Sequence, residues 1–452
     1  MTNYLELAQS VVQQAAEASG VEVEVIITDS SETEIRVDRG EVEKLAQASS
    51  RGMGVRVIDG GRTGYAYTSD LSPESVETTW RTALELAEVA TPDEHRALPD
   101  PQPIPQDDLE IWDKDLASVS VADKIALAKR IEQAALDYDP RVVMTNWCTY
   151  QDGLSHVYLA NSRGFAGEYG QTVSVGFLYA IARDEDGGMV NAVGLGATNY
   201  FNELDAEAIG REAGYKAVSM LGGKQVETQV GTVILDHFAG AQILAALAQA
   251  LTAESWQKQR SFLLDKIGQS VGSDMVTLMD NGRMKRGLAS APFDGEGVPT
   301  RATRLIDEGG LQNLIYDSYS AHKAGVGSTG HAQRAGHRSL PQLGPSNFYM
   351  QPGNISPQEM IKGVSKGMYV LSIMQTGGID PVTGDCSMGA SGLWIENGEI
   401  VGPVNGVTIA TTLGGFLENI TQVGDDLRMM PFFGTIGVPT LRVDNVTIGG
   451  VN

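Results

Sequence analysis

The sequence predicts an α+β protein in which a duplicated α-β(4)-α N-terminal region precedes a β-rich, mixed C-terminal domain. Three observations predict this fold. The order helix, four strands, helix occurs twice before residue 222, and a proline-rich stretch separates the two occurrences. Beyond Lys224 helical patterns become rare, and Gly, Pro and Asn divide the chain into short strands. A chain of 452 residues is also too long for one ordinary core.

The first predicted unit opens with a helix capped by Thr2 or Asn3 and ending at Gly20, where a residue without a side chain suits a left-handed cap. Apolar and polar residues then alternate on both sides of Asp29-Ser-Ser, which is typical of two half-buried strands joined by a turn. The four strands are expected over 21–27, 33–37, 54–58 and 64–68, and a second helix is expected after Ser72-Pro73.

Five prolines between residues 92 and 105 predict an extended linker, because proline fixes φ and offers no N–H. A second unit then repeats the order, with strands on both sides of Gln151-Asp-Gly and a last helix ending at Gly222. The predicted boundaries are 1–95 for the first unit, 96–114 for the linker, 115–222 for the second unit and 223–452 for the C-terminal domain.

Composition limits the classes of partner. The formal net charge is −24, so the chain repels nucleic acid and anionic membranes, and neither is expected as a partner. No apolar run is long enough to span a bilayer, and Met1-Thr-Asn-Tyr-Leu-Glu does not begin a signal peptide. Cys148 and Cys386 are the only cysteines and lie far apart, which predicts a reducing, cytoplasmic location without disulfides.

Three patterns imitate catalytic motifs. The segment 268–272 matches GxSxG around Ser270, but it follows a helical stretch and leads into a strand, the reverse of a nucleophile elbow. The segment 325–330 matches GxGxxG, yet no apolar helix follows it. His322, His331 and His337 are spaced nine and six residues apart, which fits neither a helix face nor a tight metal loop.

A polar junction between a predicted strand and a predicted helix, at 233–242, is a common position for an active site. The residues there are unsuited to hydrolysis, because a catalytic zinc needs about three ligands and an open position for water. Asp236 and His237 are adjacent, so their side chains diverge, and Ala241 offers no ligand.

Together with this junction, several long segments resemble the TldD/PmbA peptidase family, and the resemblance covers essentially the whole chain. The segments are 290–300, Asp317–Lys323, 328–330, Thr383–Glu399 and Asp444–Gly450, with 36–43 and 52–56 near the N-terminus. The long TGD…IENGE run makes the resemblance specific. It implies that 223–452 is equivalent to the domain that carries the peptidase site, in a family that pairs a catalytic TldD-type subunit with a PmbA/TldE-type subunit.

The resemblance also implies what this chain lacks. The catalytic type carries HExxxH and a downstream cysteine as a zinc site, and the matching positions here are Asp236, His237 and Ala241. Where that type has its cysteine, this chain reads 423–427 without a thiol. No catalytic or metal-binding residue is therefore expected in this chain. It resembles the non-catalytic subunit, which needs no cofactor of its own, while a TldD-type partner holds zinc and unfolded peptides are the substrates.

Glycine-dense strands suggest how such a subunit binds a peptide main chain, by letting the peptide add as an extra strand. The candidate residues are Gly377, Gly378, Thr383, Gly384, Asp385, Gly389, Ser391 and Gly392. Tight turns inside the domain explain the same glycines equally well. Two further functions stay open: an acidic protein that binds DNA gyrase, and a stand-alone hydrolase built around Ser270 or His322. Homodimers are expected to be possible when the partner is absent.

Overall fold

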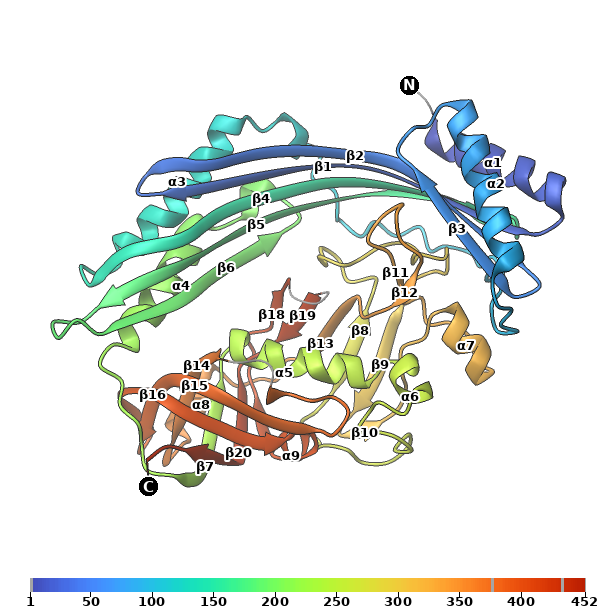
Figure 1. The fold of residues 1–452 in the computed structure, drawn as a ribbon. Coiled ribbons are helices and arrows are strands. Elements are labelled where there is room, and N and C mark those ends of the chain that lie inside the picture. The colour runs from blue at the N-terminus through green and yellow to red at the C-terminus, as the bar shows by residue number, and fades with distance from the viewer. Residues whose placement is uncertain (1–2, 375–377, 432–434, 452) are drawn as a thin grey trace.

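The computed structural model describes residues 3–374, 378–431 and 435–451. A long, curved N-terminal sheet forms an arch over a C-terminal region of shorter strands, and helices lie at both ends of the arch (Figure 1). The α+β class and the β-rich C-terminal region predicted from the sequence are confirmed.

The arch is a single antiparallel sheet with the strand order β3-β2-β1-β4-β5-β6. Its elements are α1 (Tyr4–Ser19), β1 (Glu22–Asp38), β2 (Glu41–Asp59), β3 (Arg62–Thr68), α2 (Pro73–Val89), α3 (Val121–Leu136), β4 (Val142–Asn161), β5 (Ala166–Arg183), β6 (Met189–Thr198) and α4 (Ala206–Ser219). The order helix, three strands, helix therefore occurs twice, and β1 of the first occurrence pairs with β4 of the second. Short 3-10 turns lie at Leu116–Ser118 and Phe201–Glu203.

The predicted count of four strands in each unit is wrong, because two predicted turns are the middles of long strands. Asp29 pairs with Arg51 on one side and with His156 on the other, so Asp29-Ser-Ser continues β1. Gln151-Asp-Gly likewise continues β4, where the buried Asp152 carboxylate lies 2.6 Å from the Lys124 ammonium. A polar residue that has ladder partners, and an ion-pair partner where it is buried, does not have to leave the sheet.

The two faces of the arch differ. Val25 and Ile27 of β1 belong to a buried cluster that includes residues of α1 and α2, and Ile35 and Val37 belong to a cluster that includes residues of α3 and α4. The helices therefore cover the convex face. Alternate residues of β1, such as Thr28, point from the concave face towards the C-terminal region.

The C-terminal region contains a sheet of order β10-β9-β8-β13-β19-β18 and a second of order β16-β15-β14-β7-β20-β17, in which β16 also pairs with β20 and closes a barrel. The strands are β7 (Gln229–Leu235), β8 (Leu278–Asn281), β9 (Ala302–Asp307), β10 (Gly310–Leu311), β11 (Ala332–Gln333), β12 (Gln342–Leu343), β13 (Asn347–Met350), β14 (Lys366–Met374), β15 (Asp385–Glu396), β16 (Glu399–Thr412), β17 (Ile420–Val423), β18 (Arg428–Met430), β19 (Thr435–Val438) and β20 (Leu441–Gly449). The helices are α5 (His237–Ala250), α6 (Ala253–Gln257), α7 (Ser318–Ala324), α8 (Pro357–Lys362) and α9 (Leu413–Glu418).

Residues 96–113 contain neither helix nor strand. Within the described residues, no helix is both long enough and apolar enough to cross a membrane.

Candidate functional site

The polar junction predicted from the sequence lies where β7 leads into α5. Asp236 is the N-cap of α5, and its Oδ1 accepts a hydrogen bond of 2.8 Å from the backbone N–H of Ala239. An N-cap carboxylate satisfies a helix N–H that has no partner within the helix. The side chain is buried, so its second oxygen needs a partner within the protein.

That partner is a lysine from the arch. Lys216 of α4 places its Nζ 2.6 Å from Asp236 Oδ2 and 2.9 Å from Glu212 Oε1, and Lys216 and Asp236 are both buried. Arg428 of β18 completes the group at 2.8 Å from Glu212. Burial alone would lower the pKa of Lys216, but the charges of Asp236 and Glu212 raise it above its usual value. The ammonium therefore keeps its proton beside Asp236.

His237, the first residue of α5, points to a different segment. Its Nε2 lies 3.0 Å from Asp426 Oδ2 and 2.7 Å from the backbone oxygen of Asp426, so Nε2 carries a proton in this arrangement. Asp426 also accepts hydrogen bonds from the N–H and hydroxyl of Thr440. Burial raises the pKa of Asp426, but these hydrogen bonds and the one from His237 lower it to about 2. The fold thus brings the segment 423–427 to the start of α5.

These residues do not fit a zinc ion. Three protein donors are the minimum for a zinc site, and Ala241 offers none, because its side chain is a methyl group, which packs in the apolar core. The Asp236 carboxylate is already paired with an ammonium, which would repel a divalent cation. Across the described residues, no group of three or more His, Cys, Asp or Glu side chains is arranged to hold a metal.

The other end of the arch is also joined to the C-terminal region by buried charges. Arg56 of β2 lies 2.7 Å from Glu24 of β1 and 3.0 Å from Glu296 of the C-terminal region, and all three side chains are buried. Arg334 contacts Glu24 from the C-terminal side. Burial alone would lower the pKa of Arg56, but the two carboxylates raise it, so the guanidinium stays charged.

The motifs that imitate catalytic sites have structural roles. Ser270 is exposed, and its hydroxyl donates to the backbone oxygen of Gly272. Gly325 is the left-handed cap of α7, so the segment 325–330 follows a helix rather than a strand. Neither geometry supplies a nucleophile elbow or a dinucleotide site.

The three histidines that crowd one stretch of sequence have separate partners. His331 is buried, with Nε2 3.0 Å from Asp280 Oδ1. His337 places Nδ1 2.8 Å from the Thr28 hydroxyl of the arch. His322 lies on the exposed side of α7.

Three of the eight residues suggested for binding a peptide main chain lie inside a strand that is paired on both sides. Gly389, Ser391 and Gly392 belong to β15, which pairs with β14 on one side and β16 on the other. Their backbone groups are thus used within the sheet, in a strand and not in the tight turns offered as the alternative to peptide binding. A Cβ on Gly392 would lie 1.9 Å from the Tyr369 carbonyl oxygen, so this backbone approach requires glycine. The remaining candidates are Gly378, Thr383, Gly384 and Asp385, which precede or begin β15, and Gly377, which lies outside the described residues.

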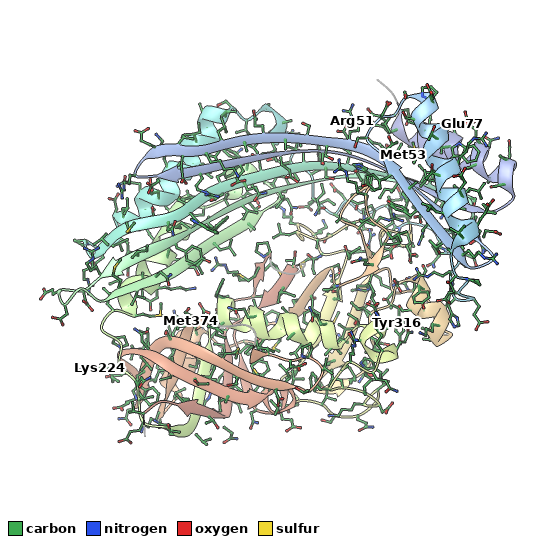
Figure 2. All side chains as sticks on the ribbon, in the orientation of Figure 1. Arg51, Met53, Glu77, Lys224, Tyr316 and Met374 are labelled. Atoms are coloured by element: carbon green, nitrogen blue, oxygen red, sulfur yellow. The ribbon has the colours of Figure 1, made fainter. Side chains whose placement is uncertain are left out.

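Two cavities lie between the arch and the C-terminal region. The larger, of about 670 Å³, is lined by residues of β1, β4 and β5, among them Ser30 and Gln171, and by C-terminal segments that include Arg334. The second, of about 600 Å³, lies beside β6, α4 and β18, and Glu212 and Arg428 line it. Side chains fill the space under the arch more densely near Met53 and Tyr316 than towards Met374 (Figure 2). Glu212 and Arg428 of the ion-paired group at α5 therefore border a cavity whose volume lies in the usual range of ligand-binding pockets.

The arch is joined at both ends to a region that contains a barrel, and the strand-to-helix junction lies beneath it. Sequence models of a family of metallopeptidases match three consecutive parts of this chain: PmbA/TldA metallopeptidase domain 1 at residues 23–87, the central domain at 114–221 and the C-terminal domain at 228–450. The chain therefore belongs to the PmbA/TldD metallopeptidase family.

Individual relatives agree with this assignment. The chain is 30% identical over 444 residues to Metalloprotease PmbA of Escherichia coli O157:H7, covering 97% of this chain and 96% of that protein. A Thermotoga maritima crystal structure, described as a candidate modulator of a DNA gyrase, matches with a TM-score of 0.90 at 25% identity over 99% of this chain and 100% of that one. TldE from Thermococcus kodakarensis shares the fold, with a TM-score of 0.90 at 22% identity over 98% and 99% of the two chains.

Proposed function

We propose that this chain is the non-catalytic, PmbA/TldE-type subunit of a two-subunit metallopeptidase. In this proposal a TldD-type partner holds zinc, the complex is cytoplasmic, and its substrates are unfolded peptides that it degrades or matures. The observation that carries the proposal is the ion pair of 2.6 Å between Lys216 and Asp236 at the position where the catalytic type has its first histidine. The relatives are named metalloproteases, whereas the residues of this chain do not fit a metal.

The role left to such a subunit is to bind and confine the substrate. The larger cavity beneath the arch is lined by short polar side chains such as Ser30 and Ser155, by Arg334, and by apolar side chains such as Leu154 and Phe293. The polar groups donate and accept hydrogen bonds without selecting particular side chains, which suits peptides of varied sequence. The residues of the α5 junction help to shape one wall through Glu212 and Arg428.

The first test is elemental analysis of the purified, untagged chain made without a partner, followed by mixing with a TldD-type chain from the same source. We expect almost no zinc in this chain, no peptide cleavage by it alone, and chelator-sensitive cleavage by the mixture. Replacing the glutamate of the partner's HExxxH should abolish cleavage. The matched change in this chain, His237→Gln, should leave cleavage by the mixture unchanged. About one tightly bound zinc per chain, or cleavage by this chain alone, would contradict the proposal.

A second variant tests the residue mapping. Installing HExxxH here with Asp236→His, His237→Glu and Ala241→His should yield neither zinc binding nor cleavage, because Lys216 remains and the segment 423–427 lacks a cysteine. Zinc-dependent cleavage by this triple variant would show that the mapping is wrong.

One observation favours a second candidate function. The T. maritima protein of the same fold is described as a candidate modulator of a DNA gyrase, and a net charge of −24 suits a protein that occupies a DNA-binding surface. Salt-sensitive binding of purified gyrase by this chain without a partner, at micromolar concentration, would favour this function over the peptidase subunit.

A further inference from the structure

The first half of β2 is the most exposed part of the arch. From Glu41 to Arg51 every residue is exposed except Ala46, which is half-buried. β1 pairs with one edge of this segment, whereas β3 begins its pairing only at Met53. Among the described residues, the outer edge of β2 from Glu41 to Gly52 thus has no neighbouring strand over about 37 Å, at about 3.4 Å per residue. Arg51 lies at the upper edge of the arch in Figure 2.

Between Leu45 and Ser50 this edge lacks the features that usually prevent strand pairing. Natural edges are kept short, bulged, interrupted by proline or charged along their length. The register with β1 shifts at Glu43, where a bulge lies, but it runs regularly from Lys44 to Arg51, and the segment contains no proline. The stretch from Leu45 to Ser50 carries no charge. Its backbone groups are therefore free to form a regular ladder with another chain.

Apolar side chains accompany the free edge on the convex face. Leu45 is 48% exposed and Val42 is 38% exposed, and they pair across the ladder with Ile35 and Val37, which are buried. The apolar surface that packs against α3 thus continues to the edge of the sheet, where Leu45 and Val42 are exposed to solvent. A strand added at this edge would cover both side chains.

The charges of the segment match a second copy of the same segment. Glu41 and Glu43 are balanced by Lys44 and Arg51, so the edge is locally neutral in a chain of net charge −24. A two-fold axis perpendicular to the sheet requires antiparallel pairing with one residue opposite itself. If that residue is Gln47, the regular stretch from Lys44 to Ser50 pairs with itself. Glu43, at the bulge, then lies at the end of this ladder beside Arg51 of the other copy, and the symmetry repeats this contact. No like charges face each other in this register.

We infer that the free edge of β2 is an isologous interface, at which two copies of this chain pair antiparallel about Gln47 and join their arches into one continuous sheet. This inference concerns the arch alone and does not depend on the metal content of the α5 junction. It assigns a surface to the homodimer expected for the chain without its partner.

A single cysteine tests the geometry, because both native cysteines are buried and free. Residues directly opposite in an antiparallel pair have Cα atoms about 4.5–5.5 Å apart, which suits a disulfide. Gln47→Cys should therefore form a covalent dimer under mild oxidation. Ser49→Cys is the matched control on the same face. It lies opposite Leu45 of the other copy, so the two new cysteines are roughly 13 Å apart along the strand and should not cross-link.

Light scattering at tens of micromolar provides the second measurement. The wild-type chain should have twice its monomer mass. Gln47→Arg, which places two like charges face to face, should be a monomer with unchanged circular dichroism. Gln106→Arg adds the same charge at an exposed site in the segment between α2 and α3 and should stay dimeric. A monomeric wild type, a dimeric Gln47→Arg, or equal cross-linking of the two cysteine variants would overturn the inference. The inference would also be overturned if this chain associated with a TldD-type chain but never with a second copy of itself.

Discussion

Replacing Lys216 by methionine should destabilise the start of α5, because it leaves a buried carboxylate without its cation. Lys216 Nζ is 2.6 Å from Asp236, and the side chains are 8% and 3% exposed. Removing one partner of a buried ion pair costs about 3–5 kcal/mol. The helix N-terminus stabilises the remaining Asp236 charge by about 0.3–1 kcal/mol. The net loss for Lys216→Met should therefore be about 3 kcal/mol.

A second change should reverse most of that loss. Asparagine keeps the hydrogen bond from Asp236 to the Ala239 N–H and is as good an N-cap as aspartate. The double variant Lys216→Met with Asp236→Asn should therefore lie within about 1 kcal/mol of the wild type, since a neutral pair often replaces a buried ion pair without loss. Asp236→Asn alone leaves Lys216 paired with Glu212 and should lower the stability of this junction by about 1 kcal/mol.

Hydrogen exchange of the α5 amides is the suitable assay, because a chain with several cores does not have one unfolding free energy. A loss of about 3 kcal/mol corresponds to roughly a hundredfold faster exchange through local opening, and α1 at the far end of the arch serves as the internal reference. If Lys216→Met accelerates α5 exchange less than about tenfold, or if the double variant exchanges as fast as the single one, the ion pair does not hold this junction together.

Three further predictions concern the buried ion-pair groups at the two ends of the arch and the junction at α5. Hydrogen bonds from Arg428 and the charge of Lys216 outweigh burial and lower the pKa of Glu212 to about 2, and the pKa of Asp426 is also about 2. Both carboxylates therefore stabilise the fold above their unfolded pKa values near 4, and this stability should be lost as the pH falls from about 4.5 to 2. When the midpoint of urea unfolding is measured against pH, its fall below about pH 4.5 should be smaller in Glu212→Gln than in the wild type. An equal fall in both would refute the stabilising role of ionised Glu212. Arg56→Met should lower the free energy of unfolding by about 3–5 kcal/mol and speed proteolysis of residues 96–113. Adding Glu296→Gln to this variant should recover part of the lost stability. Equal rates of digestion of the wild type and Arg56→Met would count against a stabilising ion pair between Arg56 and Glu296. The variant carrying the installed HExxxH should bind cobalt no more tightly than the wild type in an absorbance titration, and a tetrahedral cobalt spectrum would contradict the misfit of the donors.

The duplication and the class of fold were predictable from hydrophobic alternation and from the proline-rich stretch, because these patterns are local. The strand count was not predictable, because it depends on partners far away in sequence. Asp29-Ser-Ser has the composition of a turn, and only its pairing with Arg51 and His156 keeps it in β1. The charge on Asp152 likewise has its partner, Lys124, on α3.

The same distinction applies to the site. The sequence indicated that Asp236, His237 and Ala241 make a poor metal site, since this follows from residue types alone. It did not indicate Lys216, which lies before β7 on a helix of the arch and resembles any other amphipathic helix residue. A lysine on the apolar face of a predicted helix was the available signal, because such a charge needs a buried partner. The exposure of β2 was equally hidden, as its composition is that of an ordinary polar strand.

The two buried ion-pair groups have a mechanical consequence for access to the space beneath the arch. Arg56 and Glu296 join the arch to the C-terminal region at one end, and Lys216 and Asp236 join it at the other. A hinge at either end must separate oppositely charged groups in a medium of low polarity, at a cost of several kcal/mol. The arch therefore resists bending away from the C-terminal region at either end. Under the function proposed above, this rigidity would favour peptides that are already extended over folded domains, before any side chain is recognised.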